Sequence, residues 1–251
     1  MAINTDKNSY TIIFAAIMVV VVGSVLAFFS SSLKEKIGEN ERLEKQQNIL
    51  YAMGVNENED EGSVNFVPTD KVAGEFSKYI VEQLVIEGDQ ITKNDQAYLI
   101  DLKKQLSLGK KGETQKLPLL IGEKDGKRFY IIPMYGSGLW DAIWGFVSLD
   151  SELVVQGVYF DHKGETPGLG ANIKQRYFMD DFTGETVLNG SAEYVGIKVA
   201  KGNNDPTNKI KDDNEVDALA GATITGNGVT AMIKERLKLY KPYLETIKGK
   251  N

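Results

Sequence analysis

The chain has 251 residues, 42% of them hydrophobic, which fits one globular domain of ordinary size or two small ones. Its 35 acidic and 29 basic residues give a formal net charge of −6, the wrong sign for a protein that binds phosphate backbones, so we expect no nucleic-acid partner. The absence of cysteine excludes disulfides, thiolate metal sites and a cysteine nucleophile, and the single histidine, His162, would have to serve any serine–histidine mechanism or histidine-rich metal site.

The first expected element is a transmembrane helix at residues 10–33, behind a short tail at 1–9. No charged residue lies between Asn8 and Leu33, and the run TIIFAAIMVVVVGSVLAFF is almost entirely apolar. About 20 such residues cross the hydrocarbon core of a bilayer. A cleavable signal peptide would have a shorter apolar region behind a basic segment. Lys7 is the only basic residue before this run, so the sequence favours a retained anchor.

The charges beside this helix leave its orientation open. Lys34, Lys36, Arg42 and Lys45 follow the helix, and by the positive-inside rule they favour a cytoplasmic C-terminal domain. Long domains cross the membrane regardless of flanking charge, however, so the count does not decide the side.

Residues 34–62 are expected to form a post-membrane helix and an acidic linker. The helix should dock through its late apolar residues and stop near Gly54, and the stretch NENEDEGS has the composition of a solvated linker rather than of a calcium loop. A domain at 63–251 follows, and its segment 70–88 fits a helix or a helix–strand pair.

The next segments are rich in strand signals. Residues 116–136 predict a hairpin around an Asp-Gly turn at Asp125 and Gly126, and 139–170 predict two further strands joined by Asp-Ser-Glu. Residues 175–184 fit a helix or irregular chain, 194–202 fit a strand, and 227–247 have the apolar spacing of an amphipathic helix. The fold class expected is α+β: one N-terminal transmembrane helix, then a mainly antiparallel sheet with flanking helices.

Common nucleotide and hydrolase motifs are incomplete in this chain. GLGANI carries Ile173 where a dinucleotide fingerprint needs its third glycine, and no P-loop is present. YGSGLW has Tyr135 where a nucleophile elbow needs glycine, which argues against a serine hydrolase.

Two glycine-rich loops remain, HKGETPGLGANI at 162–173 and DALAGATITGNGV at 217–229. Taken alone, the first could be a tight structural turn and the second a helix-capping turn. Small residues just before a helix leave backbone N–H groups open, which makes an anion site suited to a phosphate, and a threonine hydroxyl can carry a phosphoester. The second loop therefore also fits a phosphate attachment site.

DALAGAT resembles the flavinylation motif D-x-x-(S/T)-G-A-T of FMN-binding domains, in which FMN is joined to the final threonine by a phosphoester bond. GETPGLG resembles the H-x-x-E-T-P-G-L-G element of the same family, with His162 in register. Behind a single membrane helix, the two elements resemble the C-subunit family of the sodium-pumping NADH:quinone oxidoreductases. The G-subunit family of the Rnf ferredoxin:NAD oxidoreductases shares these features and stays an alternative. Ala220 departs from the motif, because a serine or threonine usually stands there.

The resemblance implies an FMN-binding region at about 117–240 and a role for each matching residue. Thr223 would be the covalent attachment site, with Thr225 as the alternative hydroxyl. Asp217 would begin the motif read by a flavin transferase. The remaining FMN contacts implied are Gly221 and Ala222 at the phosphate, Glu165, Thr166, Gly168, Leu169 and Gly170 along the isoalloxazine, Gly138 and Trp140 on its other side, and Lys201. Trp140 could instead be a core residue, and His162 is expected to stabilise its loop.

The function implied is that of a membrane-anchored electron-transfer subunit with covalent FMN, with no catalytic residue and no metal of its own. Its partners would be other membrane and cytoplasmic subunits of an NADH:quinone oxidoreductase, and a flavin transferase during maturation. Its domain would lie on the periplasmic side of a bacterial inner membrane. No stand-alone NADH oxidation is expected. The alternative from another class is a membrane-tethered, non-enzymatic binding module in which both loops are only turns.

Overall fold

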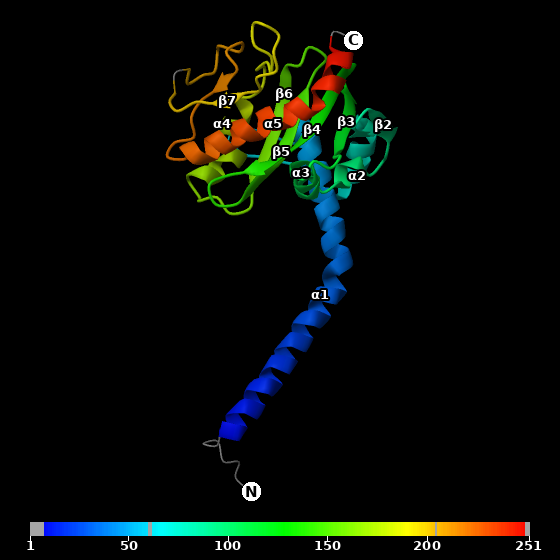
Figure 1. Cartoon of the computed structure of the whole chain (residues 1–251), viewed down its shortest axis with the longest axis vertical. Helices are drawn as coiled ribbons and strands as arrows, with labels where there is room; N and C mark the ends of the chain where they lie inside the picture. Colours follow the sequence, from blue (N-terminus) through cyan, green and yellow to red (C-terminus); the bar gives the residue numbers. More distant parts are fainter. Residues whose placement is uncertain (1–7, 60–61, 204, 249–251) are drawn as a thin grey trace. The chain divides into compact units, whose positions relative to one another are not determined.

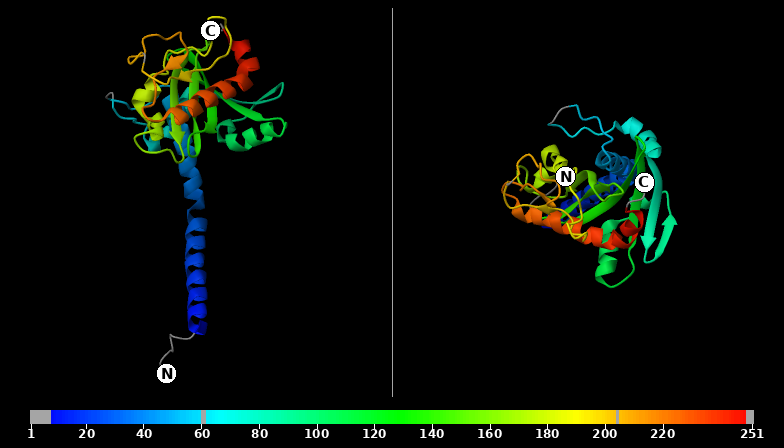
Figure 2. Two further views of the ribbon diagram at one scale, coloured as in Figure 1. Left: turned by 60° about the vertical axis from the view of Figure 1, so that its left-hand side comes forward. Right: turned by 90° about the horizontal axis from the view of Figure 1, so that it is seen from above.

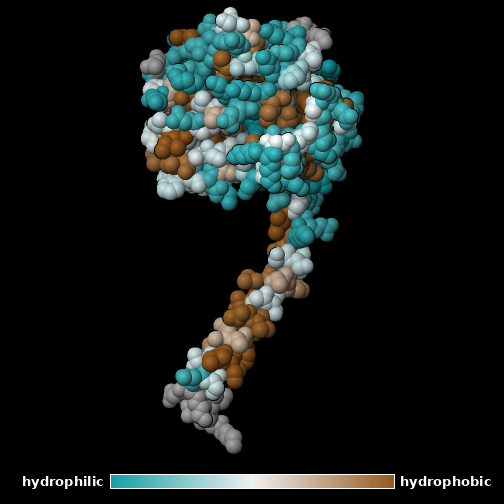
Figure 3. All heavy atoms as spheres, in the orientation of Figure 1, coloured by the Kyte–Doolittle hydropathy of each residue, from teal (hydrophilic) through white to brown (hydrophobic). Residues whose placement is uncertain are grey.

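The computed structural model describes residues 8–59, 62–203 and 205–248. The chain divides into two compact units, Met1–Leu43 and Glu44–Asn251. A single continuous helix, α1 (Asn8–Ala52), contains both the predicted anchor and the predicted post-membrane helix. Among the described residues, α1 is the one helix long and apolar enough to cross a membrane. Its large apolar side chains between Ile12 and Leu33 are exposed and form the brown stretch along the helix in Figure 3, as a lipid-facing surface requires.

The second unit begins at Glu44, earlier than the boundary expected at residue 63. The end of α1 therefore belongs to the globular domain, and it terminates as the sequence predicts. Gly54 adopts a φ of 71°, its N–H donates to the Tyr51 carbonyl, and the Val55 N–H donates to the Leu50 carbonyl. This pair of bonds is the Schellman arrangement, in which a glycine in the left-handed region closes the helix.

The domain is built on a six-stranded antiparallel sheet of order β2-β1-β3-β4-β5-β6. The bounds are β1 Ile80–Glu87, β2 Gln90–Lys93, β3 Lys116–Lys124, β4 Lys127–Ser137, β5 Ala142–Leu149 and β6 Val155–His162. Of the two forms predicted for 70–88, the structure has the helix–strand pair, α2 (Thr69–Tyr79) followed by β1. The short helices η1 (Ala97–Leu99) and α3 (Leu102–Lys110) connect β2 to β3.

The predicted hairpin is present as β3 and β4. Its turn residues, Asp125 and Gly126, have φ values of 53° and 75°. Two successive positive φ angles are the signature of the type I′ turn, whose twist matches that of the flanking strands. Lys124 consequently pairs with Lys127, which sets the register of both strands.

Helices cover both faces of the sheet (Figures 1 and 2). The closing helix α5 (Thr223–Ile247) lies across one face, where a Cβ on Gly136 of β4 would stand 2.8 Å from the Cβ of Met232. The last turn of α1 packs on the opposite face, where a Cβ on Gly157 of β6 would stand 2.7 Å from the Ala52 carbonyl oxygen. Because these two strand positions are glycine, the Met232 side chain of α5 and the backbone of α1 can approach the sheet closely.

The chain between β6 and α5 forms a separate layer of short elements. It contains η2 (Gly170–Lys174), α4 (Arg176–Asp180) and a parallel pair, β7 (Lys198–Val199) and β8 (Glu215–Val216). The strand predicted at 194–202 is thus only two residues long. The closing helix begins at Thr223 rather than Asn227, so both candidate threonines lie in its first turn. The α+β class with a mainly antiparallel sheet is confirmed.

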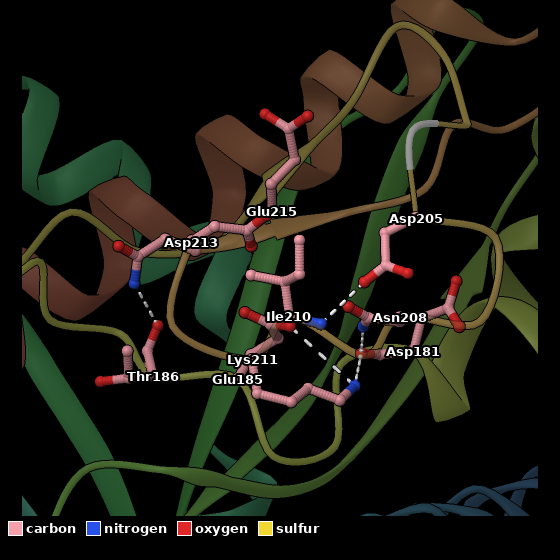
Figure 4. Close-up of polar contacts among 10 residues, drawn as sticks. Asp181, Glu185, Thr186, Asp205, Asn208, Ile210, Lys211, Asp213 and Glu215 are labelled. Atoms are coloured by element: carbon pink, nitrogen blue, oxygen red, sulfur yellow. Dashed lines mark hydrogen bonds and ion pairs between the residues drawn. The ribbon is translucent and has the colours of Figure 1, made fainter.

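Lys211 anchors the segment that leads into β8 (Figure 4). Its ammonium donates to the Asp181 carbonyl at 3.0 Å and lies 3.9 Å from a carboxylate oxygen of the fully buried Glu185. The Asn208 side chain donates to the same Asp181 carbonyl, and the Asn214 side chain donates to the Leu188 carbonyl at 3.0 Å. These bonds fix residues 208–214 against the loop that follows α4.

Candidate functional site

Thr223 is the first residue of α5 and lies exposed at the surface. The preceding turn uses Gly221 at a φ of 66°, and the N-cap residue, Ala222, has no side chain that could cap the helix. The first N–H groups of a helix have no acceptor within it, and the helix dipole makes that end favourable for an anion. Within 8–59, 62–203 and 205–248, no residue hydrogen-bonds to the Thr223 hydroxyl. The hydroxyl is therefore free beside a natural anion site.

Thr225 is in the opposite situation although it is only two residues away. Its side chain is 1% exposed, and its hydroxyl donates to Oε2 of Glu165 at 2.6 Å. The two threonines of the motif are thus distinguished by burial and by hydrogen bonding. No side chain caps α5, so a capping threonine is not the explanation of this segment.

Glu165 is a buried carboxylate at the centre of this arrangement, with 4% of its surface exposed. Oε1 accepts the Trp140 N–H at 2.9 Å, and the Glu165 N–H donates to Nδ1 of His162 at 3.2 Å. Burial by itself would raise the pKa of Glu165, but the hydrogen bonds from Thr225 and from the Trp140 N–H outweigh it and leave the pKa below its usual value. The group is therefore an ionised acceptor.

Two glycines make room for the Glu165 carboxylate. A Cβ on Gly138 would lie 2.4 Å from Oε1, and a Cβ on Gly170 would lie 2.4 Å from Oε2 and 2.5 Å from the Thr225 hydroxyl. A third glycine, Gly228 on α5, lies against the Ser137 carbonyl, which a Cβ would approach to 2.4 Å. These positions need glycine because of space, since a Cβ never approaches an oxygen so closely.

Large apolar side chains stand exposed on the β4–β5 loop, on the loop after β6 and at the start of α5. Trp140 is 70% exposed, and Leu139, Leu169 and Ile224 are also exposed. Gly221 lies against Leu169, whose Cδ2 would be 2.8 Å from an added Cβ. The exposure of Trp140 excludes the interpretation that it is a core residue. Exposed apolar groups gathered on loops are typical of a binding surface.

Some of the other predicted residues lie next to Glu165 in the chain, and others lie on the β7–β8 pair. Thr166 and Gly168 are exposed on the turn that follows Glu165. Lys201 and Asp217 stand just past β7 and β8, whose ends are joined by the Ala218 N–H to the Gly202 carbonyl at 3.3 Å. Among the described residues, no hydrogen bond or ion pair joins Lys201 or Asp217 to Glu165, and the charge of Asp217 acts instead on Asp181, whose pKa is raised by burial and further by Asp217.

The strand pair is in turn tied to α5. The Val199 N–H donates to the Thr230 hydroxyl at 3.0 Å, and a Cβ on Gly226 would lie 2.9 Å from the Val199 side chain. Through these contacts, β7 is held beside the first two turns of α5.

The candidate site is an exposed surface rather than an enclosed pocket. Two cavities, of about 970 and about 280 Å³, lie elsewhere in the domain: the larger is lined by Arg128, Tyr130 and Tyr243 among others, and the smaller by Tyr98 and Trp144 among others. Neither is lined by a predicted site residue. In the described part of the chain, no group of three or more His, Asp or Glu side chains could hold a metal ion.

Sequence reasoning missed three residues of this surface. The motifs assign no role to Leu139 and Ile224, although an apolar residue inside a polar, glycine-rich loop can indicate a binding surface. The need for glycine at Gly228 cannot be predicted from the sequence, because the Ser137 carbonyl that it contacts lies in a distant loop. A close approach between distant loops leaves no local trace in the sequence.

Comparisons with known proteins show the family of the chain. The family model described as FMN-binding domain matches residues 138–238. The C subunit of the Na(+)-translocating NADH-quinone reductase of Yersinia pestis is 30% identical over 239 residues, covering 90% of this chain and 87% of that protein. The protein of the same name from Pseudomonas aeruginosa is 28% identical over 244 residues, covering 92% and 91%.

Solved structures lead to the same family. The crystal structure of the Na(+)-translocating NADH-quinone reductase C subunit from Parabacteroides distasonis aligns with a TM-score of 0.70 at 28% identity, covering 84% of this chain and 96% of that one. NqrC of Shewanella oneidensis shares the fold, with a TM-score of 0.62 at 21% identity. These matches decide between the two families that the motifs left open. The chain belongs to the family of Na(+)-translocating NADH-quinone reductase C subunits.

Proposed function

We propose that this chain is the membrane-anchored, FMN-carrying electron-transfer subunit of a sodium-translocating NADH:quinone oxidoreductase, with FMN joined to Thr223 by a phosphoester bond. The observation that carries the proposal is the contrast between the two threonines. The Thr223 hydroxyl is exposed and free of partners among the described residues, whereas Thr225 is buried and bonded to Glu165. Of the two threonines of the motif, Thr223 is the one whose oxygen is accessible to a modifying enzyme.

The surroundings of Thr223 fit a phosphate. The open N–H groups of the first turn of α5 and the positive end of its dipole favour a negative group at this position. Gly221, in the left-handed region, turns the chain so that Ala222 and Thr223 begin the helix with small side chains. The phosphate would be held by the backbone of this turn.

The exposed apolar side chains fit a flat aromatic ring. Trp140, Leu169 and Ile224 come from three segments that meet at Glu165 and offer a surface on which an isoalloxazine can stack. Thr166 and Gly168, on the exposed turn after Glu165, would border the ring. FMN, when bound, accepts and donates electrons, and the protein supplies position and surroundings. During electron transfer, no side chain of this site has to act as a nucleophile or base.

The partners follow from the same proposal. Electrons must arrive from and leave to cofactors on other membrane and cytoplasmic subunits, because this chain has neither cysteine ligands nor a complete dinucleotide-binding motif. A flavin transferase would read the segment that begins at Asp217. The domain would lie on the periplasmic side of the inner membrane, anchored by the apolar stretch of α1.

Mass spectrometry of the denatured chain, purified from a host that carries the transferase, tests the attachment. We expect an adduct with the mass of FMN minus water on the peptide that contains Thr223, and its loss in Thr223→Ala. An unmodified chain from such a host would refute the covalent flavoprotein. It would instead favour a tethered binding module in which the glycine-rich loops are only turns.

The orientation has a separate test, which the absence of cysteine makes clean. A single cysteine at Ser191, an exposed loop residue of the domain, should react with a membrane-impermeant maleimide on spheroplasts. A single cysteine at Ser9, before the apolar stretch, should react only after the membrane is opened. The reverse pattern would place the domain in the cytoplasm.

A further inference from the structure

Glu165 joins three segments that are distant in the sequence. Its carboxylate accepts the Trp140 N–H of the β4–β5 loop and the Thr225 hydroxyl of α5, and its own N–H is held by His162 at the end of β6. The bond to Thr225 alone spans 60 residues. Because Glu165 is 4% exposed, it faces the interior and is unsuited to the ring contact that the motif resemblance implies.

The first turn of α5 has no anionic side chain of its own and no side-chain cap. An acid near a helix N-terminus stabilises the helix by interacting with its dipole. Glu165 provides this charge from a neighbouring loop, and its bond to Thr225 attaches the first turn to the β4–β5 loop. The carboxylate therefore holds the first turn through the Thr225 side chain and leaves the backbone N–H groups of that turn open.

The same bond gives the two threonine hydroxyls of the motif different environments. Thr225 points inward to Glu165 at 2.6 Å, while Thr223 lies exposed two residues earlier. A hydroxyl that is buried and donates to a carboxylate is shielded from any modifying enzyme. Its position also fixes the rotation of the first helical turn, and with it the direction in which Thr223 projects.

We propose that Glu165 is a positioning residue for flavin attachment: by binding the Thr225 hydroxyl it orients the first turn of α5, presents Thr223 at the surface and withdraws Thr225 from modification. This inference rests on the proposed function, in which Thr223 is the acceptor. It assigns Gly138 and Gly170 a role as well, since side chains at either position would displace the carboxylate. Glu165 thereby determines site selectivity without touching the phosphate.

The first test measures the geometry without any flavin. In the unmodified full-length chain in detergent, hydrogen exchange of the amides at 139–141 and 223–226 should be about tenfold faster in Thr225→Val, which removes one donor from a buried charged acceptor. Thr225→Ser, which keeps the hydroxyl, should exchange like the parent chain. Thr230→Val is the matched control, because Thr230 makes its bonds to Val199 and Gly226 rather than to Glu165.

The second test measures modification by the transferase under limiting conditions. Thr225→Val and Glu165→Gln should carry FMN at a rate about tenfold lower than the parent chain, again the effect of losing one bond to a buried charged group, and Thr225→Ser should restore it. Equal slowing in Thr230→Val would mean a general loss of stability and would overturn the inference. So would parent-like exchange and parent-like modification in both Thr225→Val and Glu165→Gln.

The third test separates this inference from the proposed function. Thr223→Ala should carry no flavin at all, because Glu165 still withholds Thr225. An adduct on Thr225 in that variant would overturn the selectivity assigned to Glu165 while leaving the chain a covalent flavoprotein. Absence of any adduct in the parent chain would refute the proposed function, and the hydrogen-exchange comparison would then still decide whether Glu165 orients the first turn of α5.

Discussion

Glu185 should make the stability of the domain depend on pH in a predictable direction. Its side chain is fully buried, and neither carboxylate oxygen has a hydrogen-bond partner in the described structure. Burial raises its pKa from 4.5 to about 7, the nearby Lys211 ammonium opposes the rise, and Asp213 and Asp181 add to it. Because the folded state binds this proton more tightly than the unfolded chain, the contribution to stability is complete below pH 4.5 and is lost as the pH rises through about 7.

The magnitude follows from the same shift. At about 1.36 kcal/mol for each pKa unit, a rise from 4.5 to about 7 corresponds to roughly 3 kcal/mol of stability lost on ionisation. In Glu185→Gln this term is absent, because an amide does not titrate. The free energy of unfolding of Glu185→Gln should therefore increase relative to the parent chain by roughly 3 kcal/mol between about pH 4.5 and pH 8.

Urea denaturation of the full-length chain in detergent, followed by tryptophan fluorescence at several pH values, measures this difference. Glu215→Gln is the matched control, since Glu215, on β8 of the same layer, forms a partly exposed ion pair with Lys198. Its difference from the parent should stay within about 1 kcal/mol throughout. Parallel pH profiles of the parent and Glu185→Gln, or a difference that shrinks as the pH rises, would refute the argument that the buried carboxylate is destabilised when ionised.

Three further predictions concern the effect of single substitutions on stability. Gly170→Ala should lower the free energy of unfolding by about 1–3 kcal/mol in thermal denaturation, because its Cβ would lie 2.4 Å from a buried carboxylate oxygen, while Gly164→Ala on the same loop, whose nearest neighbour is 3.7 Å away, should change it little. Thr223→Val should leave the stability of the flavin-free chain within about 0.5 kcal/mol of the parent, but Thr225→Val should cost about 1–3 kcal/mol, and equal effects would contradict the contrast between the two hydroxyls. Gly54→Ala should cost about 1 kcal/mol by the same assay, because its φ of 71° strains a residue with a Cβ, and an unchanged melting temperature would mean that the turn after α1 is not held in this conformation.

Much of the local structure could be predicted from the sequence, because its causes are local. A long apolar run specifies α1, two residues that tolerate positive φ specify the hairpin turn between β3 and β4, and a glycine specifies the end of α1 at Gly54. The apolar spacing of 227–247 identifies α5, although its start, Thr223, lies one turn earlier than expected. In each case the deciding interactions lie within a few residues of one another.

The sequence by itself also determined the candidate chemistry, since its two glycine-rich motifs resemble those of FMN-binding domains, and the family comparison agrees. It could not determine which threonine is free, because that depends on the bond between Glu165 and Thr225. Only the tertiary structure brings these residues together, since the sheet places the end of β6 beside the start of α5. Burial and pairing between distant loops follow from packing, and no periodicity or motif encodes them locally.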